Sequence, residues 1–293
     1  MKITPFRIFD KLIDFSFNKN GLFLCQVDLG EYFMEYWISK EDKPAILLLH
    51  AFGPNGKYSW RKQIKALSKE YNIIIPNLLY FGNSTNKNKN YHIQEQIKAV
   101  TSLLNHLKIN SFVLGGTSYG GAIAFELLYN NNFAIKKLFI INSPVKYVFE
   151  EGWGKIMKDF GVEKKSDVLI PDNYLKLKNI YDLINYKKKP FPKIVFKDIF
   201  NTLYTFQTKE RKLLIDTFKE DQKILKHRTY KSDIPILLVW GKEDVLCPLM
   251  TAIKLKEHLG ENARLEVISK ARHMPHIERK KTFNKILLDF IST

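Results

Sequence analysis

The sequence predicts a doubly wound α/β fold with a mostly parallel sheet, and three features of the 293-residue chain carry this prediction. Short apolar runs recur along the chain, segments with helical periodicity lie between them, and one long stretch without such a run interrupts the alternation. Strands joined by helical crossovers form a parallel sheet that is buried on both faces. Because 45% of the residues are hydrophobic, the chain can bury such a core.

The predicted strands are short runs rich in branched apolar residues. Residues 24–28 and 32–38, joined through Leu29 and Gly30, form an antiparallel hairpin at the edge of the sheet. The other predicted strands are residues 45–49, 73–75, 112–114, 138–141, 236–240 and 265–268. The sheet therefore has about eight strands.

The predicted helices follow from the spacing of apolar residues. Ile93, Ile97, Val100, Leu104 and Leu107 recur at steps of four and three, which places them on one helix face. Residues 60–67 repeat this pattern one connection earlier, and residues 283–291 form a closing amphipathic helix.

The interruption of the alternation defines the predicted domain organisation. Residues 145–230 are rich in Lys and aromatic residues, have helical patterns and contain no buried strand run, so they form a helical insertion. The core then comprises residues 25–144 and 231–293, and residues 1–24 form a separate N-terminal segment.

The N-terminal segment has the pattern of an amphipathic helix. Its apolar residues are interleaved with Lys2, Arg7, Lys11 and Lys19. Two interpretations stay open, which are packing on the helical insertion or on the edge hairpin, and peripheral contact with an anionic membrane. Asp10 and Asp14 interrupt the apolar run, which argues against a cleaved signal peptide, and no run is long enough to span a bilayer. We expect a cytoplasmic protein.

The formal charge of +17 does not by itself name a partner. A nucleic-acid-binding surface requires clustered charge or a motif. The insertion, with 19 Lys and Arg against 12 Asp and Glu, is no such cluster, so we expect no nucleic-acid partner. Cys25 and Cys247 are far apart and belong to no Cys/His cluster, so no metal site is predicted.

One motif indicates nucleophilic catalysis. Gly116-Thr117-Ser118-Tyr119-Gly120 has the pattern G-x-S-x-G and stands between a buried strand and a helix. In this context the glycines allow a tight turn that exposes the serine hydroxyl, which marks Ser118 as a candidate nucleophile.

A serine nucleophile requires a base and a carboxylate that orients it. Asp244 follows the strand at residues 236–240 and is favoured over Glu243. His273 follows the strand at residues 265–268 and is favoured over His276 as the base. The order Ser, Asp, His along the chain is the order that the G-x-S-x-G motif requires.

The reaction also requires donors for an oxyanion. The turn after residues 45–49 places the backbone amide of Phe52 in a suitable position, and the amide of Tyr119 follows the nucleophile. His50 is interpreted as a residue that holds this turn.

The motifs His50–Gly53, Tyr80–Ser84, GTSYGG, GKED and ARHMPHIER together resemble the α/β-hydrolase superfamily, and within it the monoacylglycerol-lipase-like and plant lipase/esterase-like branch. The resemblance implies the α/β-hydrolase fold, a triad of Ser118, Asp244 and His273, an inserted helical cap at residues 145–230 and no cofactor. The sequence departs from the usual pattern at Ala51 in place of Gly, Asn77 in place of Asp and Arg272 in place of Gly.

These features predict a serine hydrolase that cleaves carboxylic esters with an apolar acyl chain. The alternatives are a thioesterase or carbon-carbon bond hydrolase with the same triad, and a ligand-binding receptor on this scaffold. A serine at this position argues against dehalogenases and epoxide hydrolases, which use an Asp nucleophile. Aromatic side chains of the cap are candidates for lining an acyl pocket, namely Tyr147, Phe149, Trp153, Phe160, Phe196, Phe200, Tyr204 and Phe206.

Overall fold

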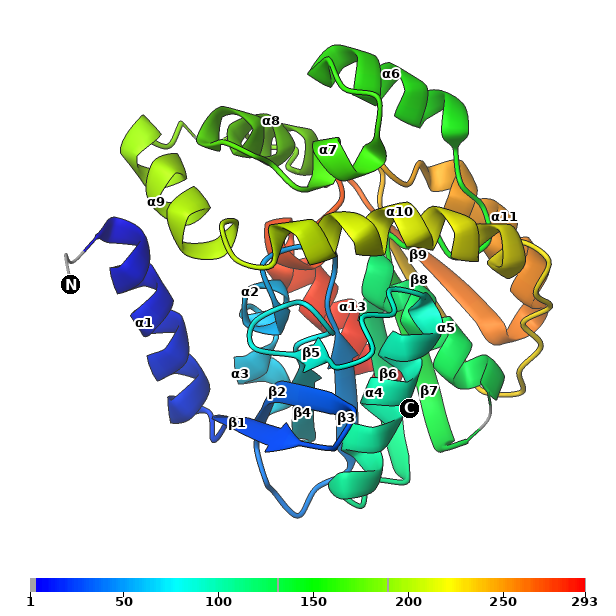
Figure 1. The fold of residues 1–293 in the computed structure, drawn as a ribbon. Coiled ribbons are helices and arrows are strands. Elements are labelled where there is room, and N and C mark those ends of the chain that lie inside the picture. The colour runs from blue at the N-terminus through cyan, green and yellow to red at the C-terminus, as the bar shows by residue number, and fades with distance from the viewer. Residues whose placement is uncertain (1–3, 131, 189, 293) are drawn as a thin grey trace.

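The computed structural model describes residues 4–130, 132–188 and 190–292, which form a twisted sheet with helices on both faces and a layer of helices above one edge (Figure 1). The strands are β1 (Phe23–Asp28), β2 (Tyr32–Ile38), β3 (Ala45–Leu49), β4 (Asn72–Pro76), β5 (Thr85–Asn86), β6 (Ser111–Thr117), β7 (Ala134–Ile141), β8 (Ile236–Gly241) and β9 (Ala263–Ile268).

The sheet has the predicted doubly wound arrangement. Its strand order is β1-β2-β4-β3-β6-β7-β8-β9. β1 and β2 form the antiparallel hairpin at the edge, β2 pairs antiparallel with β4, and the pairs from β4 to β9 are parallel. The sheet has nine strands rather than about eight because the two-residue strand β5 pairs with β2. Two residues are too few to show a strand pattern in the sequence.

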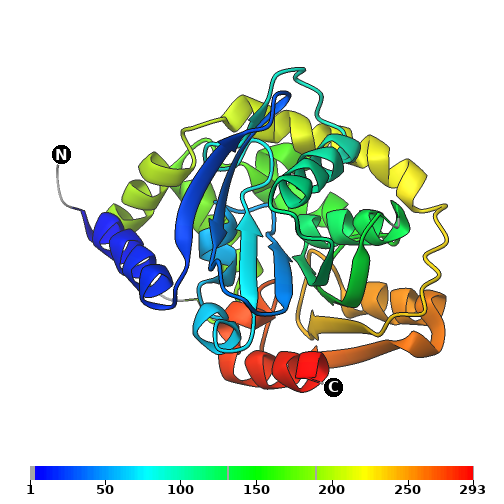
Figure 2. The same ribbon diagram turned by 90° about the horizontal axis from the view of Figure 1, so that it is seen from below.

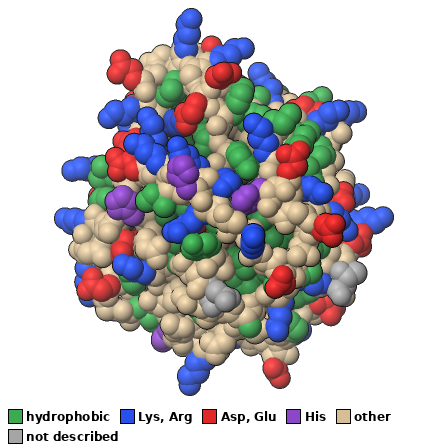
Figure 3. Space-filling model, turned by 90° about the vertical axis from the view of Figure 1, so that its right-hand side faces the viewer, with side chains coloured by type: hydrophobic (Ala, Val, Ile, Leu, Met, Phe, Trp, Pro, Cys, Tyr) green, Lys and Arg blue, Asp and Glu red, His purple; other side chains and the backbone are tan. Residues whose placement is uncertain are grey.

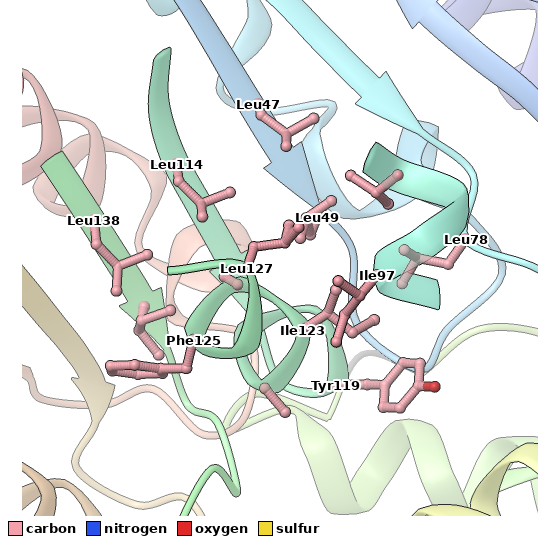
Figure 4. Close-up of a cluster of buried hydrophobic side chains, with 14 of the residues drawn as sticks. Leu47, Leu49, Leu78, Ile97, Leu114, Tyr119, Ile123, Phe125, Leu127 and Leu138 are labelled. Atoms are coloured by element: carbon pink, nitrogen blue, oxygen red, sulfur yellow. The ribbon is translucent and has the colours of Figure 1, made fainter. Parts of the chain in front are cut away.

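Helices cover both faces of the sheet. They are α1 (Pro5–Lys19), α2 (Gly56–Trp60), α3 (Ile64–Leu67), α4 (Ile93–His106), α5 (Tyr119–Asn130), α11 (Leu249–Leu259), α12 (Pro275–Glu278) and α13 (Lys280–Ser292), with a short 3-10 helix at Gly260–Asn262. α4, α5 and α11 contribute to one core, and α2, α3 and α13 to the other, so that α4 and α13 lie on opposite sides of the sheet (Figure 2). Ile123 and Leu127 of α5 lie among strand residues such as Leu49 and Leu114 (Figure 4).

The prediction of one helix over residues 60–67 is wrong. In the structure, α2 ends at Trp60 and α3 begins at Ile64. The turn between them ends at Gln63, whose buried side-chain amide donates to the carbonyl oxygen of His276 at 2.8 Å and to Oδ1 of Asn284 at 3.0 Å. These bonds hold the turn against the last two helices.

Five helices lie between β7 and β8, within the predicted insertion at residues 145–230. They are α6 (Glu150–Phe160), α7 (Lys165–Leu169), α8 (Tyr174–Ile184), α9 (Lys193–Leu203) and α10 (Thr208–Leu225). They form the layer above the sheet in Figure 1. We use the name cap for residues 145–230.

Helix α1 lies beside α9 at one side of the molecule (Figure 1). Its buried face contains Phe6, Ile13 and Phe17, and the ring of Phe17 contacts that of Trp37 at 4.8 Å between centroids. The remaining surface of the helix exposes Ile8, Phe9, Leu12 and Phe15 by 43–66%. Lys2, which belongs to the predicted basic pattern, lies outside the described residues.

Among the described residues, none of the helices combines the length and the apolar character that a bilayer span requires. On the face of the molecule that carries α11, Lys and Arg side chains are scattered with Asp and Glu among them (Figure 3). This face shows no block of one charge sign.

Candidate active site

Ser118 stands at the sharp turn between β6 and α5. Its backbone has a φ of +51°, in the left-handed region, and its amide donates to the carbonyl of Ile141 at 2.8 Å. Gly116 and Gly120 do not have positive φ values and are required for close packing instead. A Cβ on Gly120 would lie 2.5 Å from the carbonyl oxygen of His50, and one on Gly116 would lie 2.5 Å from that of Gly120. The strain of the turn is therefore held by the serine itself.

The structure brings Ser118, His273 and Asp244 together at the carboxyl ends of β6, β9 and β8. Nε2 of His273 lies 3.0 Å from Oγ of Ser118, and Nδ1 lies 2.8 Å from Oδ2 of Asp244. Asp244 and His273 are buried, and Ser118 is partly exposed. With the proton on Nδ1, His273 donates to Asp244 and can accept the proton of the Ser118 hydroxyl.

A fourth residue, Asn142, supports this arrangement. Its side-chain amide donates to Oδ2 of Asp244, and its Oδ1 accepts from the amide of Gly241 at 3.0 Å. Asn142 is buried and has a φ of +42°. The signal in the sequence is its place directly after β7, at the same edge of the sheet.

His276 and His50 have structural positions. His276 is fully buried between the rings of Trp60 and Phe283, and burial lowers its pKa to about 3. His50 accepts from the amide of Leu78 at 2.9 Å and contacts the carbonyl of Ala51 at 2.7 Å, and burial lowers its pKa to about 4. Both histidines are therefore neutral near pH 7, and neither hydrogen-bonds to Ser118.

The two residues that were predicted to supply the oxyanion donors are Phe52, in the turn after β3, and Tyr119, and their side chains lie beside each other. The rings of Phe52 and Tyr119 are in edge contact at 5.4 Å. In the described part of the chain, neither of their backbone amides donates to a protein acceptor. Ala51 does not have a positive φ, so a residue with a Cβ can adopt its backbone conformation without the steric cost of the left-handed region.

The other two departures from the usual pattern have partners in the structure. Oδ1 of Asn77 accepts from the amide of Gly56 at 3.0 Å, and its Nδ2 donates to Oε1 of Glu35 at 2.6 Å. A carboxylate could accept the first bond but could not donate the second. Arg272 donates to the carbonyl oxygens of Asp182 and Leu183 at 2.9 and 3.2 Å, which connects the His273 loop to α8 of the cap.

Ser118 and His273 line a cavity of about 320 Å³ between the sheet edge and the cap. Of the eight candidate aromatic residues of the cap, Trp153, Phe196 and Tyr204 line it. Phe149 and Phe206 are exposed instead, by 47% and 57%. Other apolar lining residues come from α8, α9 and α10, namely Leu177, Ile180, Ile184, Ile199, Leu203, Ile215 and Phe218.

The sequence did not reveal that α1 also forms part of this wall. Phe6 and Phe9 line the cavity. The amide of Phe6 donates to Asp198 of α9 at 2.8 Å, and the ring of Phe6 stacks on that of Tyr58 at 5.7 Å. Amphipathic spacing shows which face of a helix is buried but not what it is buried against.

Cys247 lies close to the base and its carboxylate. One ligand atom each from Asp244, Cys247 and His273 lie within 4.8 Å of one another. Burial, together with the charge of Asp244, raises the pKa of the Cys247 thiol well above its usual value. A protonated thiol is a poor metal ligand, and the carboxylate already accepts from His273, so this set does not fit a resident metal.

Comparisons with known proteins agree with this fold. A family model described as the α/β hydrolase fold matches residues 44–165. A monoacylglycerol lipase of Bos taurus is 24% identical over 261 residues, which cover 86% of this chain and 76% of the relative. Epoxide hydrolase 4 of Homo sapiens is 24% identical over 278 residues, covering 90% and 76%.

Among solved structures, a bacterial membrane phospholipase A has the same fold, with a TM-score of 0.82, 17% identity and coverage of 98% of this chain and 91% of the other. The fold and the relatives together define a hydrolase. The chain has the α/β-hydrolase fold, and its relatives include monoacylglycerol lipases.

Proposed function

We propose that the protein is a serine hydrolase that cleaves carboxylic esters with an apolar acyl chain. The observation that carries this proposal is the hydrogen-bonded series Ser118, His273 and Asp244 in the wall of an apolar cavity. An epoxide hydrolase of this fold would instead have a carboxylate at position 118.

In the first half of the reaction, Oγ of Ser118 attacks the ester carbonyl while Nε2 of His273 takes the hydroxyl proton. The carbonyl oxygen becomes an oxyanion that the amides of Phe52 and Tyr119 stabilise. Asp244 holds the imidazole and stabilises its protonated form. The C–O bond then breaks, and His273 gives the proton to the leaving alcohol.

In the second half, water attacks the acyl-enzyme with His273 again as the base. The acid is released and Ser118 regains its proton. The acyl chain occupies the apolar wall that the cap and α1 provide, which includes Phe196 and Ile199.

The test is an activity panel of p-nitrophenyl esters and acyl thioesters of graded chain length, run on the wild type and on Ser118→Ala. We expect ester hydrolysis by the wild type and a loss of at least about 10³-fold in Ser118→Ala. Equal rates in the two proteins would contradict the proposal. Faster turnover of the thioesters would favour a thioesterase, and labelling of Ser118 by a fluorophosphonate without turnover would favour a receptor.

We further propose that α1 brings the enzyme to an anionic lipid surface. Support comes from Ile8, Leu12 and Phe15, which are exposed by 51%, 60% and 66% on one face of α1. Arg7 and Lys11 are on the same helix, so that cations accompany the apolar side chains. Phe9 is both exposed by 43% and part of the cavity wall, which makes this face continuous with the candidate active site.

Vesicle flotation tests this second proposal with the double variant Leu12→Glu/Phe15→Glu. The vesicles contain about 30% anionic lipid, which gives them a negative surface potential. We expect the wild type to float with these vesicles and the variant to stay in the dense fraction. The control is Ile224→Glu/Met250→Glu, at residues that are exposed by 59% and 56% outside α1. Equal flotation of all three proteins would contradict the proposal.

A further inference from the structure

The charged side chains in the cavity wall all have one sign. Arg61, Lys165 and Lys219 line the cavity, and no Asp or Glu does so among the described residues. A cavity that is otherwise apolar therefore carries positive charge without a carboxylate of its own.

Two of the three cations are accounted for by their surroundings. Nζ of Lys165 lies 2.9 Å from Oε2 of Glu150 and 5.3 Å from the ring centroid of Trp153. Lys219 is exposed, so water solvates its ammonium group.

Arg61 differs from both lysines. Its side chain donates from Nη1 to the carbonyl oxygen of Tyr58, and its Nε is buried without a hydrogen-bond partner. In the described part of the chain, it forms no ion pair with a carboxylate. Burial lowers the pKa of the guanidinium to about 10, so the group stays charged at neutral pH. A charge that is removed from water is costly unless an anion or several acceptors compensate it.

The position of Arg61 connects it to the candidate active site. It directly follows α2, in the turn that Gln63 holds against α12. His273, the candidate base, lines the same cavity as Arg61. Arg61 and Ser118 line the same cavity.

We propose that Arg61 binds an anionic group of the substrate, a phosphate or a carboxylate, so that the enzyme prefers amphiphilic esters that carry a negative group besides the acyl chain. This inference rests on the proposed ester hydrolysis at Ser118. The planar guanidinium presents a fork of N–H donors that matches both anions with two parallel hydrogen bonds. Arg61 is then a specificity-determining residue, and the apolar wall binds the acyl chain.

The first experiment compares pairs of substrates in which one member carries an added anionic group. The phosphate arm uses 1-decanoylglycerol and 1-decanoylglycerol 3-phosphate, and the carboxylate arm uses p-nitrophenyl decanoate and the mono-p-nitrophenyl ester of decanedioic acid. We expect Arg61→Gln to lower kcat/KM at least about tenfold for an anionic substrate and less than about twofold for its neutral partner. Arg61→Lys, which keeps the charge but not the fork, should retain part of the preference.

The control variant is Lys223→Gln, which removes an exposed charge from α10 outside the cavity wall and should change neither rate. The arm that shows the difference identifies the anion as phosphate or carboxylate. Equal losses on neutral and anionic substrates, or no preference by the wild type in either arm, would overturn the inference.

A binding measurement separates this inference from the proposed reaction. Calorimetry with the Ser118→Ala protein uses decyl phosphate, decanoate and decanol as probes, none of which requires catalysis. We expect at least one anion to bind more tightly than decanol, and we expect this difference to vanish in Ser118→Ala/Arg61→Gln. Tight anion binding by a wild-type protein without esterase activity would refute the proposed function alone, and equal binding of the three probes would refute the anion site.

Discussion

The side-chain amide of Asn142 donates a hydrogen bond to Oδ2 of Asp244, the same carboxylate oxygen that receives Nδ1 of His273 at 2.8 Å. Asn142 thus holds the carboxylate in the orientation that the histidine requires. Leu246 donates from its amide to the other oxygen, Oδ1, at 2.9 Å. The carboxylate is fixed from three sides before any substrate arrives.

We therefore expect Asn142→Ala to lower kcat for an ester by about tenfold with little change in KM, because the base loses orientation while the cavity keeps its shape. Steady-state kinetics with p-nitrophenyl butyrate measures both constants. Asn105→Ala, at an exposed position of α4, is the control and should leave both unchanged. An unchanged kcat in Asn142→Ala would show that Asp244 needs no such support.

The left-handed backbone of Ser118 predicts an order of stability between two inactive variants. Both Ser118→Gly and Ser118→Ala remove the hydroxyl, but only glycine adopts a φ of +51° without steric cost. Ser118→Gly should be more stable than Ser118→Ala by about 1 kcal/mol in urea unfolding. The same pair of substitutions at Ser102, inside α4, should show the opposite order. If alanine is the more stable residue at both positions, the turn is not strained.

The contact between Asn77 and Glu35 explains why an amide can replace the usual carboxylate here. Asn77→Asp would place two carboxylates together in a buried site, where Nδ2 now donates to Oε1 at 2.6 Å. We expect the free energy of unfolding at pH 7 to fall by about 2 kcal/mol. In the double variant Asn77→Asp/Glu35→Gln, the new glutamine amide can donate to the new aspartate carboxylate. Most of the lost stability should therefore be recovered. A loss that Glu35→Gln does not reduce would contradict this explanation.

The two buried neutral histidines predict acid sensitivity. Burial lowers the pKa of His276 to about 3 and of His50 to about 4, whereas both have values of 6.5 when unperturbed. Between these limits the unfolded chain binds protons that the folded protein does not, so stability falls as the pH falls below about 6.5. Each histidine should contribute a slope of about 1 kcal/mol per pH unit between pH 6 and pH 5.

Urea unfolding of the wild type and of His276→Gln at pH 7, 6 and 5 tests this expectation. The variant is less stable at pH 7 because it fills the site less well, but its stability should fall less steeply with acid. Parallel pH profiles of the two proteins would mean that His276 is not held neutral by the fold.

The extent to which the sequence predicts this structure depends on how local each signal is. The apolar runs predict the parallel strands, and the strand-turn-helix context of Ser118 places the candidate nucleophile, because each of these signals lies within a few residues. Asp244 and His273 follow from the rule that carboxyl ends of parallel strands share one edge. The two-residue strand β5 and the break before Ile64 carry no such signal.

The parts that the sequence did not predict depend on contacts between distant segments. Whether Phe6 lines the cavity depends on the position of α1 against α9, which helical spacing does not specify. Arg61 is one of many basic residues in the chain, and only the structure distinguishes it by its lack of a carboxylate partner. Asn142 directly follows a predicted strand, but its bond to Asp244 depends on the register of β7 and β8, which the sequence does not specify.

The double role of Phe9 has a kinetic consequence. With α1 on a lipid surface, an acyl chain can leave the bilayer and enter the protein along side chains alone, without passing through water. The rate of such an enzyme follows the mole fraction of substrate within the surface rather than its bulk concentration. Diluting the ester with inert lipid at constant total substrate would then slow turnover, whereas diluting the whole suspension would not.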